Sequence, residues 1–147
     1  MQYLQFNIDI SLIFYHLIQL GIAFALSLPI ALNRESRARG AGLRTFPLVA
    51  IAACAFMLVG MSVYEGSDAE ARVMYGIITG IGFIGGGAII KESGKVGGTA
   101  TAAGIWNTGA IGVATAYQIY EIALTLAIIN FCIFQFSTYF KKQDSHV

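Results

Sequence analysis

The chain alternates between five long apolar runs and short polar connections. The runs predict spans at residues 11–32, 46–64, 73–90, 99–118 and 121–140. Glu121, at the start of the last run, is the one formally charged residue in them. A transmembrane helix needs about 20 predominantly apolar residues, and each run meets or approaches that length. The residues do not alternate in polarity as membrane β-strands do, and a helix satisfies its own backbone in hydrocarbon. We therefore predict an all-α integral membrane protein, a single bundle of five transmembrane helices over residues 1–147.

Lysine and arginine gather at alternate connections between the predicted spans. They occupy the connections after the first and third spans and the C-terminal tail, at Arg34, Arg37, Arg39, Arg44, Lys91, Lys95, Lys141 and Lys142. The connection after the second span sets Arg72 against three acidic residues, and the connection after the fourth has no base. Since basic loops stay in the cytoplasm, the N-terminus is predicted outside and the C-terminus inside.

Composition supports a membrane protein rather than a soluble enzyme. Hydrophobic residues make up 56% of the chain and charged residues 12%, whereas soluble domains carry about 25% charged residues. The net charge of +1 gives no indication of a nucleic-acid partner. No catalytic motif such as GxSxG or HExxH is present. We expect the lipid bilayer as the main partner, no catalytic activity and no cofactor.

A glycine-rich motif, Gly80-Ile-Gly82-Phe-Ile-Gly85, has the spacing of a dinucleotide-binding loop. Such a loop needs a preceding strand, a following helix and an acidic residue about 20 residues later. None of these surrounds the motif, which lies within an apolar run. The pairs Gly76/Gly80 and Gly82/Gly86 instead have the four-residue spacing of close helix contacts in membranes. We predict that the glycine-rich third and fourth spans pack on each other or across a subunit interface.

Three consecutive glycines, Gly85 to Gly87, exceed what helix packing requires. Each weakens a helix by roughly 1 kcal/mol relative to alanine. Two interpretations stay open: tight packing, or a local unwinding that lines a site within the membrane. The fourth span begins after another glycine pair, and its candidates for the same contacts are Gly98, Thr101, Trp106 and Asn107. We expect a homo-oligomer, with a dimer favoured.

Few polar side chains lie within the predicted spans. His16 is the one histidine of the first span, and Gln19 follows on roughly the same helical face. Ionisable groups inside a membrane are candidates for function. His16 either donates a hydrogen bond to a neighbouring helix or takes part in a proton relay.

A candidate functional rim lies on the predicted cytoplasmic side. Its members are Arg34, Glu35, Arg44, Thr45 and Glu92. The arginines either reach lipid phosphates or pair with the two glutamates. Magnesium prefers oxygen ligands, but the spacing of these acids is no specific metal signature, so the residues leave any metal ligands unknown.

Three blocks over roughly residues 31–116 resemble the membrane domain of the MgtC/SapB family. They read "NRES…GAGLRTFPLVAIAACAFMLVG", "GIGFIGGGAIIKE" and "VGGTATAAGIWNTGAIGVA". The resemblance departs at Asn33, because many members have a glutamate beside the arginine. It also covers no C-terminal cytoplasmic domain, which many members carry.

The resemblance implies a five-helix protein of the bacterial inner membrane. It further implies a role in growth at low magnesium and in virulence. Some members are described as regulators of other membrane complexes, including the ATP synthase, and members are often labelled magnesium-transport proteins. The function implied is therefore a regulator in magnesium or cation homeostasis that acts through helix contacts with partner proteins; the alternative is a transporter or channel for Mg²⁺ or another small solute.

Overall fold

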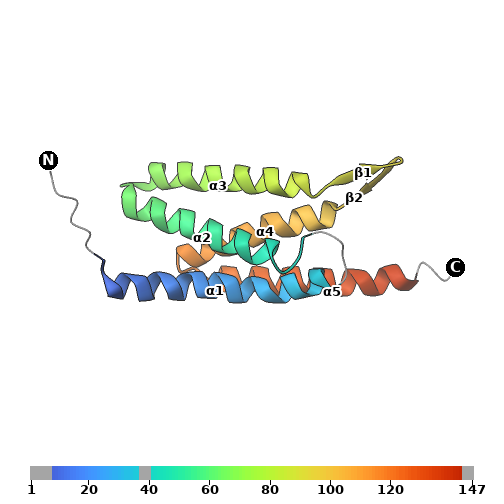
Figure 1. Cartoon of the computed structure of the whole chain (residues 1–147), viewed down its shortest axis with the longest axis horizontal. Helices are drawn as coiled ribbons and strands as arrows, with labels where there is room; N and C mark the ends of the chain where they lie inside the picture. Colours follow the sequence, from blue (N-terminus) through green and yellow to red (C-terminus); the bar gives the residue numbers. More distant parts are fainter. Residues whose placement is uncertain (1–7, 37–40, 144–147) are drawn as a thin grey trace.

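Five helices and one short hairpin make up the part of the chain that the computed structural model describes, residues 8–36 and 41–143. In chain order they are α1 (Ile10–Glu35), α2 (Thr45–Val63), α3 (Ser67–Gly87), β1 (Ile90–Glu92), β2 (Lys95–Gly97), α4 (Thr99–Ala116) and α5 (Tyr120–Gln143). The helices run up and down beside one another, so the α2–α3 and α4–α5 connections share one end of the bundle (Figure 1). The hairpin and the C-terminal end of α5 lie at the other end (Figure 1).

Each predicted span overlaps one helix, which confirms the all-helical bundle, although the end of the third span lies in β1 rather than in a helix. α1 and α2 are long and apolar enough to cross a membrane, and residues Tyr120–Phe136 of α5 form a shorter apolar stretch. Five crossings and their orientation stay predictions. α3 begins at Ser67, earlier than expected, because Asp68 and Glu70 in its first turn favour a helix N-terminus.

α1 begins at a side-chain cap supplied by Asp9. The carboxylate accepts hydrogen bonds from the backbone N–H and the hydroxyl of Ser11, at 2.8 and 2.6 Å. Both bonds favour the charged carboxylate and so lower the pKa of Asp9. The cap is therefore present at neutral pH and is lost only as the pH falls through that lowered pKa.

The glycine run lies at the end of α3 rather than at a break within the helix. The helix continues to Gly87, and the N–H groups of Ala88 and Ile89 close its last turn on the carbonyls of Gly85 and Gly86. The three glycines are therefore helical, and the helix ends directly after them, before the predicted end of the span at residue 90. Three glycines here end the helix, since glycine is a poor helix former.

A β-hairpin follows, where a plain loop was expected. β1 and β2 pair antiparallel, with Glu92 opposite Lys95. The two turn residues, Ser93 and Gly94, both have positive φ angles, 49° and 79°. A two-residue turn of this kind matches the twist of the paired strands. The Ser-Gly dipeptide was the available sequence signal for it.

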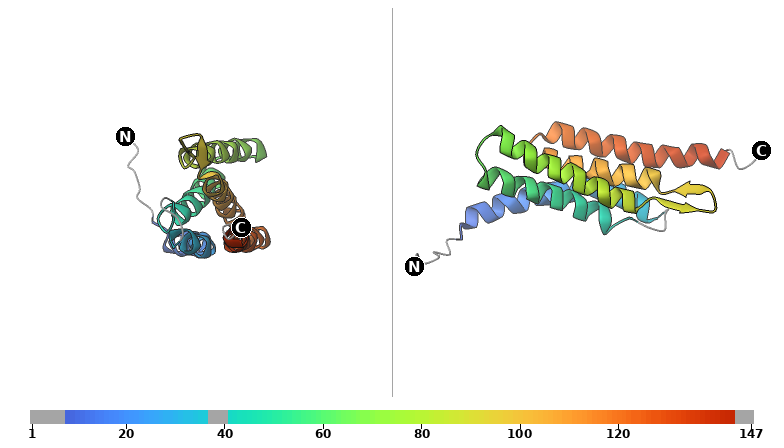
Figure 2. Two further views of the ribbon diagram at one scale, coloured as in Figure 1. Left: turned by 90° about the vertical axis from the view of Figure 1, so that its right-hand side faces the viewer. Right: turned by 90° about the horizontal axis from the view of Figure 1, so that it is seen from above.

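α4 is the central helix and contacts each of the other four. Figure 2 shows α3 on one side of the bundle and α1 and α5 on the other, with α2 and α4 between them. Three glycines of α4 leave room for atoms of these neighbouring helices to approach closely. A Cβ at Gly104 would meet the ring of Phe134 in α5, and one at Gly109 would meet Ile81 in α3. The third, Gly112, faces the backbone of α2. Small residues on α4 thus allow its central position.

Candidate functional site

Arg34 joins three helices at the C-terminal end of α1. Its guanidinium Nη2 donates a 2.6 Å hydrogen bond to the hydroxyl of Thr101 in α4. Its Cζ lies 4.9 Å from the ring centre of Phe134 in α5, a distance at which a cation is attracted to the ring face. The Arg34 side chain therefore points into the bundle. No glutamate pairs with Arg34 among the described residues, and contact with a lipid phosphate stays a prediction.

Asn33 makes a second link between α1 and α5, one residue away. Its Nδ2 donates to Oε1 of Gln135 at 2.7 Å, and the residue is buried. Three buried polar atoms in this region have no hydrogen-bond partner among the described residues: Asn33 Oδ1, Arg34 Nε and Asn130 Nδ2. We call Asn33, Arg34, Thr101, Phe134 and Gln135 the arginine cluster. It offers mainly N–H donors, which suit water or an anion rather than a hard cation such as Mg²⁺.

Glu35 organises the connection to α2. Its Oε2 accepts a 2.9 Å hydrogen bond from the backbone N–H of Leu43. A Cβ at Gly42 would displace this carboxylate and would lie 3.1 Å from the Cα of Glu35, so glycine favours the close approach of the two segments. Glu35 thus holds a loop in place; among the described residues, no ion pair joins it to an arginine.

The other residues of the predicted rim do not gather around Glu35. Arg44 is exposed immediately before α2, and Thr45 begins that helix. Glu92 lies in the exposed hairpin, opposite Lys95. The alternative in which the arginines pair with both Glu35 and Glu92 is therefore not found among the described residues, because Glu92 lies on the hairpin strand.

A separate polar cluster occupies the other end of the bundle. Gln19 is 1% exposed and accepts a hydrogen bond from the hydroxyl of Tyr120 at 2.8 Å. The hydroxyl of Tyr15 accepts from the amides of Gln19 and Gln118, at 3.2 and 2.7 Å. His16 is exposed and lies edge-on to the Tyr15 ring. The structure thus separates His16 from Gln19, which instead ties α1 to α5.

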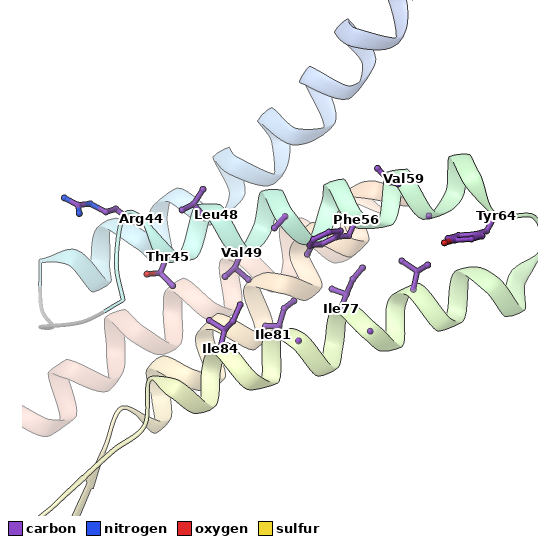
Figure 3. Close-up of a pocket in the computed structure, with 16 residues that line it drawn as sticks. Arg44, Thr45, Leu48, Val49, Phe56, Val59, Tyr64, Ile77, Ile81 and Ile84 are labelled. Carbon is purple, nitrogen blue, oxygen red and sulfur yellow. The ribbon is translucent and has the colours of Figure 1, made fainter. Parts of the chain in front are cut away.

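An apolar groove with a volume of about 800 Å³ lies between α2 and α3. It follows the length of α2, from Arg44 and Thr45 at one end to Tyr64 at the other (Figure 3). Side chains such as Phe56 and Ile77 line it from the two helices (Figure 3). A smaller cavity of about 260 Å³, which includes Trp106, separates α3 from α4 and α5. α3 therefore has one cavity on the α2 side of its contact with α4 and another on the α5 side.

Most glycines of α3 do not pack within this chain. A Cβ at Gly76, Gly80, Gly82, Gly86 or Gly87 would have nothing within 4 Å. Gly85 alone among the predicted α3 glycines is closely packed, with the Ala102 carbonyl oxygen of α4 3.0 Å from such a Cβ. The prediction that the third and fourth spans pack on each other holds at Gly85 and Gly109, and the other α3 glycines face open space.

The two remaining sequence candidates of the fourth span have different surroundings. Gly98 has a left-handed backbone, with φ of 83°, and a Cβ there would collide with the carbonyl of Ala88. Asn107 is half-buried on α4. Gly98 is thus required by the turn into α4 rather than by a binding site.

Residues 20–143 match the model of the MgtC family. The chain belongs to the MgtC family. It is similar to the uncharacterised protein slr0014 of Synechocystis, 34% identical over 88% of this chain and 57% of that protein. It is also similar to protein MgtC of Salmonella typhimurium, 38% identical over 82% of this chain and 52% of that protein. The putative magnesium transporter YhiD of Escherichia coli is 32% identical over 72% of this chain and 53% of that protein.

The chain spans about half the length of these curated relatives. No solved structure matches it. The MgtC-family membership confirms the resemblance drawn from the three sequence blocks. The second block forms the end of α3 and strand β1. The third block forms the end of β2 and most of α4.

Sequence reasoning missed three members of the arginine cluster: Asn33, Phe134 and Gln135. The first looked like a departure from the MgtC/SapB pattern, yet it is the residue that bonds α5. The available signal was the pair of polar residues Asn130 and Gln135 within an apolar helix. Such residues are costly in a membrane unless they find partners.

Proposed function

We propose that this MgtC-family protein is a regulator of magnesium or other cation homeostasis in the bacterial inner membrane. It acts through lateral contacts between its helices and those of partner membrane proteins. The names of two relatives, MgtC and the putative magnesium transporter YhiD, support the connection to magnesium. The observation that carries the helix-contact mechanism is the α2–α3 groove.

The groove suits a helix of another protein for two reasons. It extends along the whole of α2, and 19 residues of helix rise about 29 Å, close to the thickness of the hydrocarbon core. It is also lined by small residues, including Ala52, Gly76 and Gly80. Small residues allow the close backbone approach that drives helix association in lipid.

Growth of a deletion strain in low magnesium tests this function. The wild-type gene should restore growth, whereas Ala52→Phe, which fills the groove from an exposed position, should not. The matched control is Ala25→Phe, at an exposed position of α1 outside the groove, and it should restore growth like the wild type. Normal growth of the deletion strain, or equal rescue by both variants, would contradict the proposal.

Transport is tested on the same variants in purified form. The proposed function predicts no Mg²⁺ entry into proteoliposomes above that of empty vesicles. Entry that requires the protein would contradict the regulator and support the transporter alternative, for which the name of YhiD is the precedent.

A further inference from the structure

One face of α3 is apolar and turned away from the bundle. Gly76, Gly80, Phe83 and Gly87 are spaced by four, three and four residues, which puts them on one side of a helix with 3.6 residues per turn. A Cβ at any of the three glycines has nothing within 4 Å. Phe83 is 85% exposed, more than any other large hydrophobic residue in the described part of the chain. We call these four residues the α3 stripe.

The α3 stripe borders the α2–α3 groove along one edge. Gly76 and Gly80 belong to both, and Ile84 lines the groove beyond them. Helical geometry puts Phe83 at the opposite edge of the stripe from Ile84. The α3 stripe therefore has the protruding Phe83 ring along one edge and the apolar α2–α3 groove along the other. The two features lie at similar positions along the helix axis.

We propose that the α3 stripe is the interface of a parallel dimer between two copies of this chain. Copies inserted in one membrane share one orientation, so a two-fold axis along the membrane normal brings equal depths together. Rotation about that axis carries Phe83 of each copy to the groove side of the other, beside Gly80 and Ile84. The interface is thus self-complementary, because the Phe83 ring of each copy enters the groove edge of the other.

The glycines select a helix rather than lipid as the occupant. A lipid chain can fill a groove of any apolar lining, whereas two backbones approach closely only where side chains are absent. Phe83 adds apolar contact surface to the interface. Removing its ring should change the stability of the monomer little, because the ring is exposed. The inference rests on the proposed function in placing α3 in a membrane, and at Gly76 and Gly80 the second copy and a partner helix would compete for the same edge of the groove.

Cysteine cross-linking in native membranes tests the dimer. The full chain, with Cys54→Ala and Cys132→Ala to remove its own thiols, would carry single cysteines on α3. Gly76→Cys, Gly80→Cys, Phe83→Cys and Gly87→Cys should each form a disulfide-linked dimer on oxidation. Tyr75→Cys and Gly82→Cys, on the same helix but off the stripe, should give at least about fivefold less, because a disulfide needs closely spaced Cβ atoms.

A dimer at no stripe position, or equal dimer at stripe and control positions, would overturn the proposal. A second pair of variants measures affinity in detergent. Gly80→Leu should raise the dissociation constant of the dimer at least about tenfold, whereas Gly82→Leu should leave it unchanged. Both glycines have open space around them, so both variants should fold. Dimerisation in a strain without a magnesium phenotype would refute the proposed function and leave the dimer intact.

Discussion

Replacing Gly112 with alanine should lower the free energy of unfolding by about 1–3 kcal/mol, the usual range for overpacking a core. The added Cβ would collide with the carbonyl oxygen of Ala50 and lie 2.9 Å from the Cβ of Ala53. These are parts of the α2 backbone and of a short side chain, which cannot rotate away. The two helices would have to separate. Thermal unfolding in detergent micelles, followed by circular dichroism, measures the loss.

Gly82→Ala is the control for this prediction. Both substitutions gain roughly 1 kcal/mol of helix propensity, but a Cβ at Gly82 meets nothing within 4 Å. The control should therefore be as stable as the wild type or slightly more stable. Equal melting temperatures for Gly112→Ala and Gly82→Ala would show that α4 and α2 are not in close contact.

Arg34→Met and Thr101→Val should interact strongly in a double-mutant cycle. The two side chains share a 2.6 Å charge-assisted hydrogen bond, and Thr101 is buried. Either single variant leaves a polar group without its partner, whereas the double variant leaves neither group, so it should cost less than the sum of the two single variants. We expect a coupling energy of about 1–3 kcal/mol, within the range found for residues in contact, measured by unfolding in mixed micelles.

Arg44→Met provides the matched control for Arg34. The two arginines flank the same connection, but Arg44 is exposed. Its replacement should change the free energy of unfolding by no more than about 0.5 kcal/mol, as surface substitutions usually do. Additive effects of Arg34→Met and Thr101→Val would show that the arginine cluster does not join α1 to α4.

The comparison of α3 and α4 shows where reasoning from glycine spacing succeeds and where it fails. Both helices carry glycines at packing distances in sequence. On α4, Gly104, Gly109 and Gly112 each receive a neighbouring side chain or backbone. On α3, Gly76 and Gly80 receive none in this chain. Spacing indicates that a face can be approached closely, and it does not indicate which helix approaches it.

The sequence by itself determined the number of helices and their approximate bounds. Long uncharged runs can satisfy their backbone in lipid only as helices, so α1 and α2 follow from local composition alone. Membership of the MgtC family was also readable from residues 31–116, because the order of three motifs is a property of the sequence.

Only the tertiary structure decided which polar groups meet. Arg34 and Thr101 are 67 residues apart in sequence, and Asn33 and Gln135 are 102 apart. The hydropathy of a run does not show how its helix is rotated about its own axis relative to distant helices. That rotation places Thr101, and not Glu92, beside Arg34. The same rotation turned Ile77, Ile81 and Gly85 of α3 inward and left the opposite face open, because a helix buries only the side that its neighbours can reach.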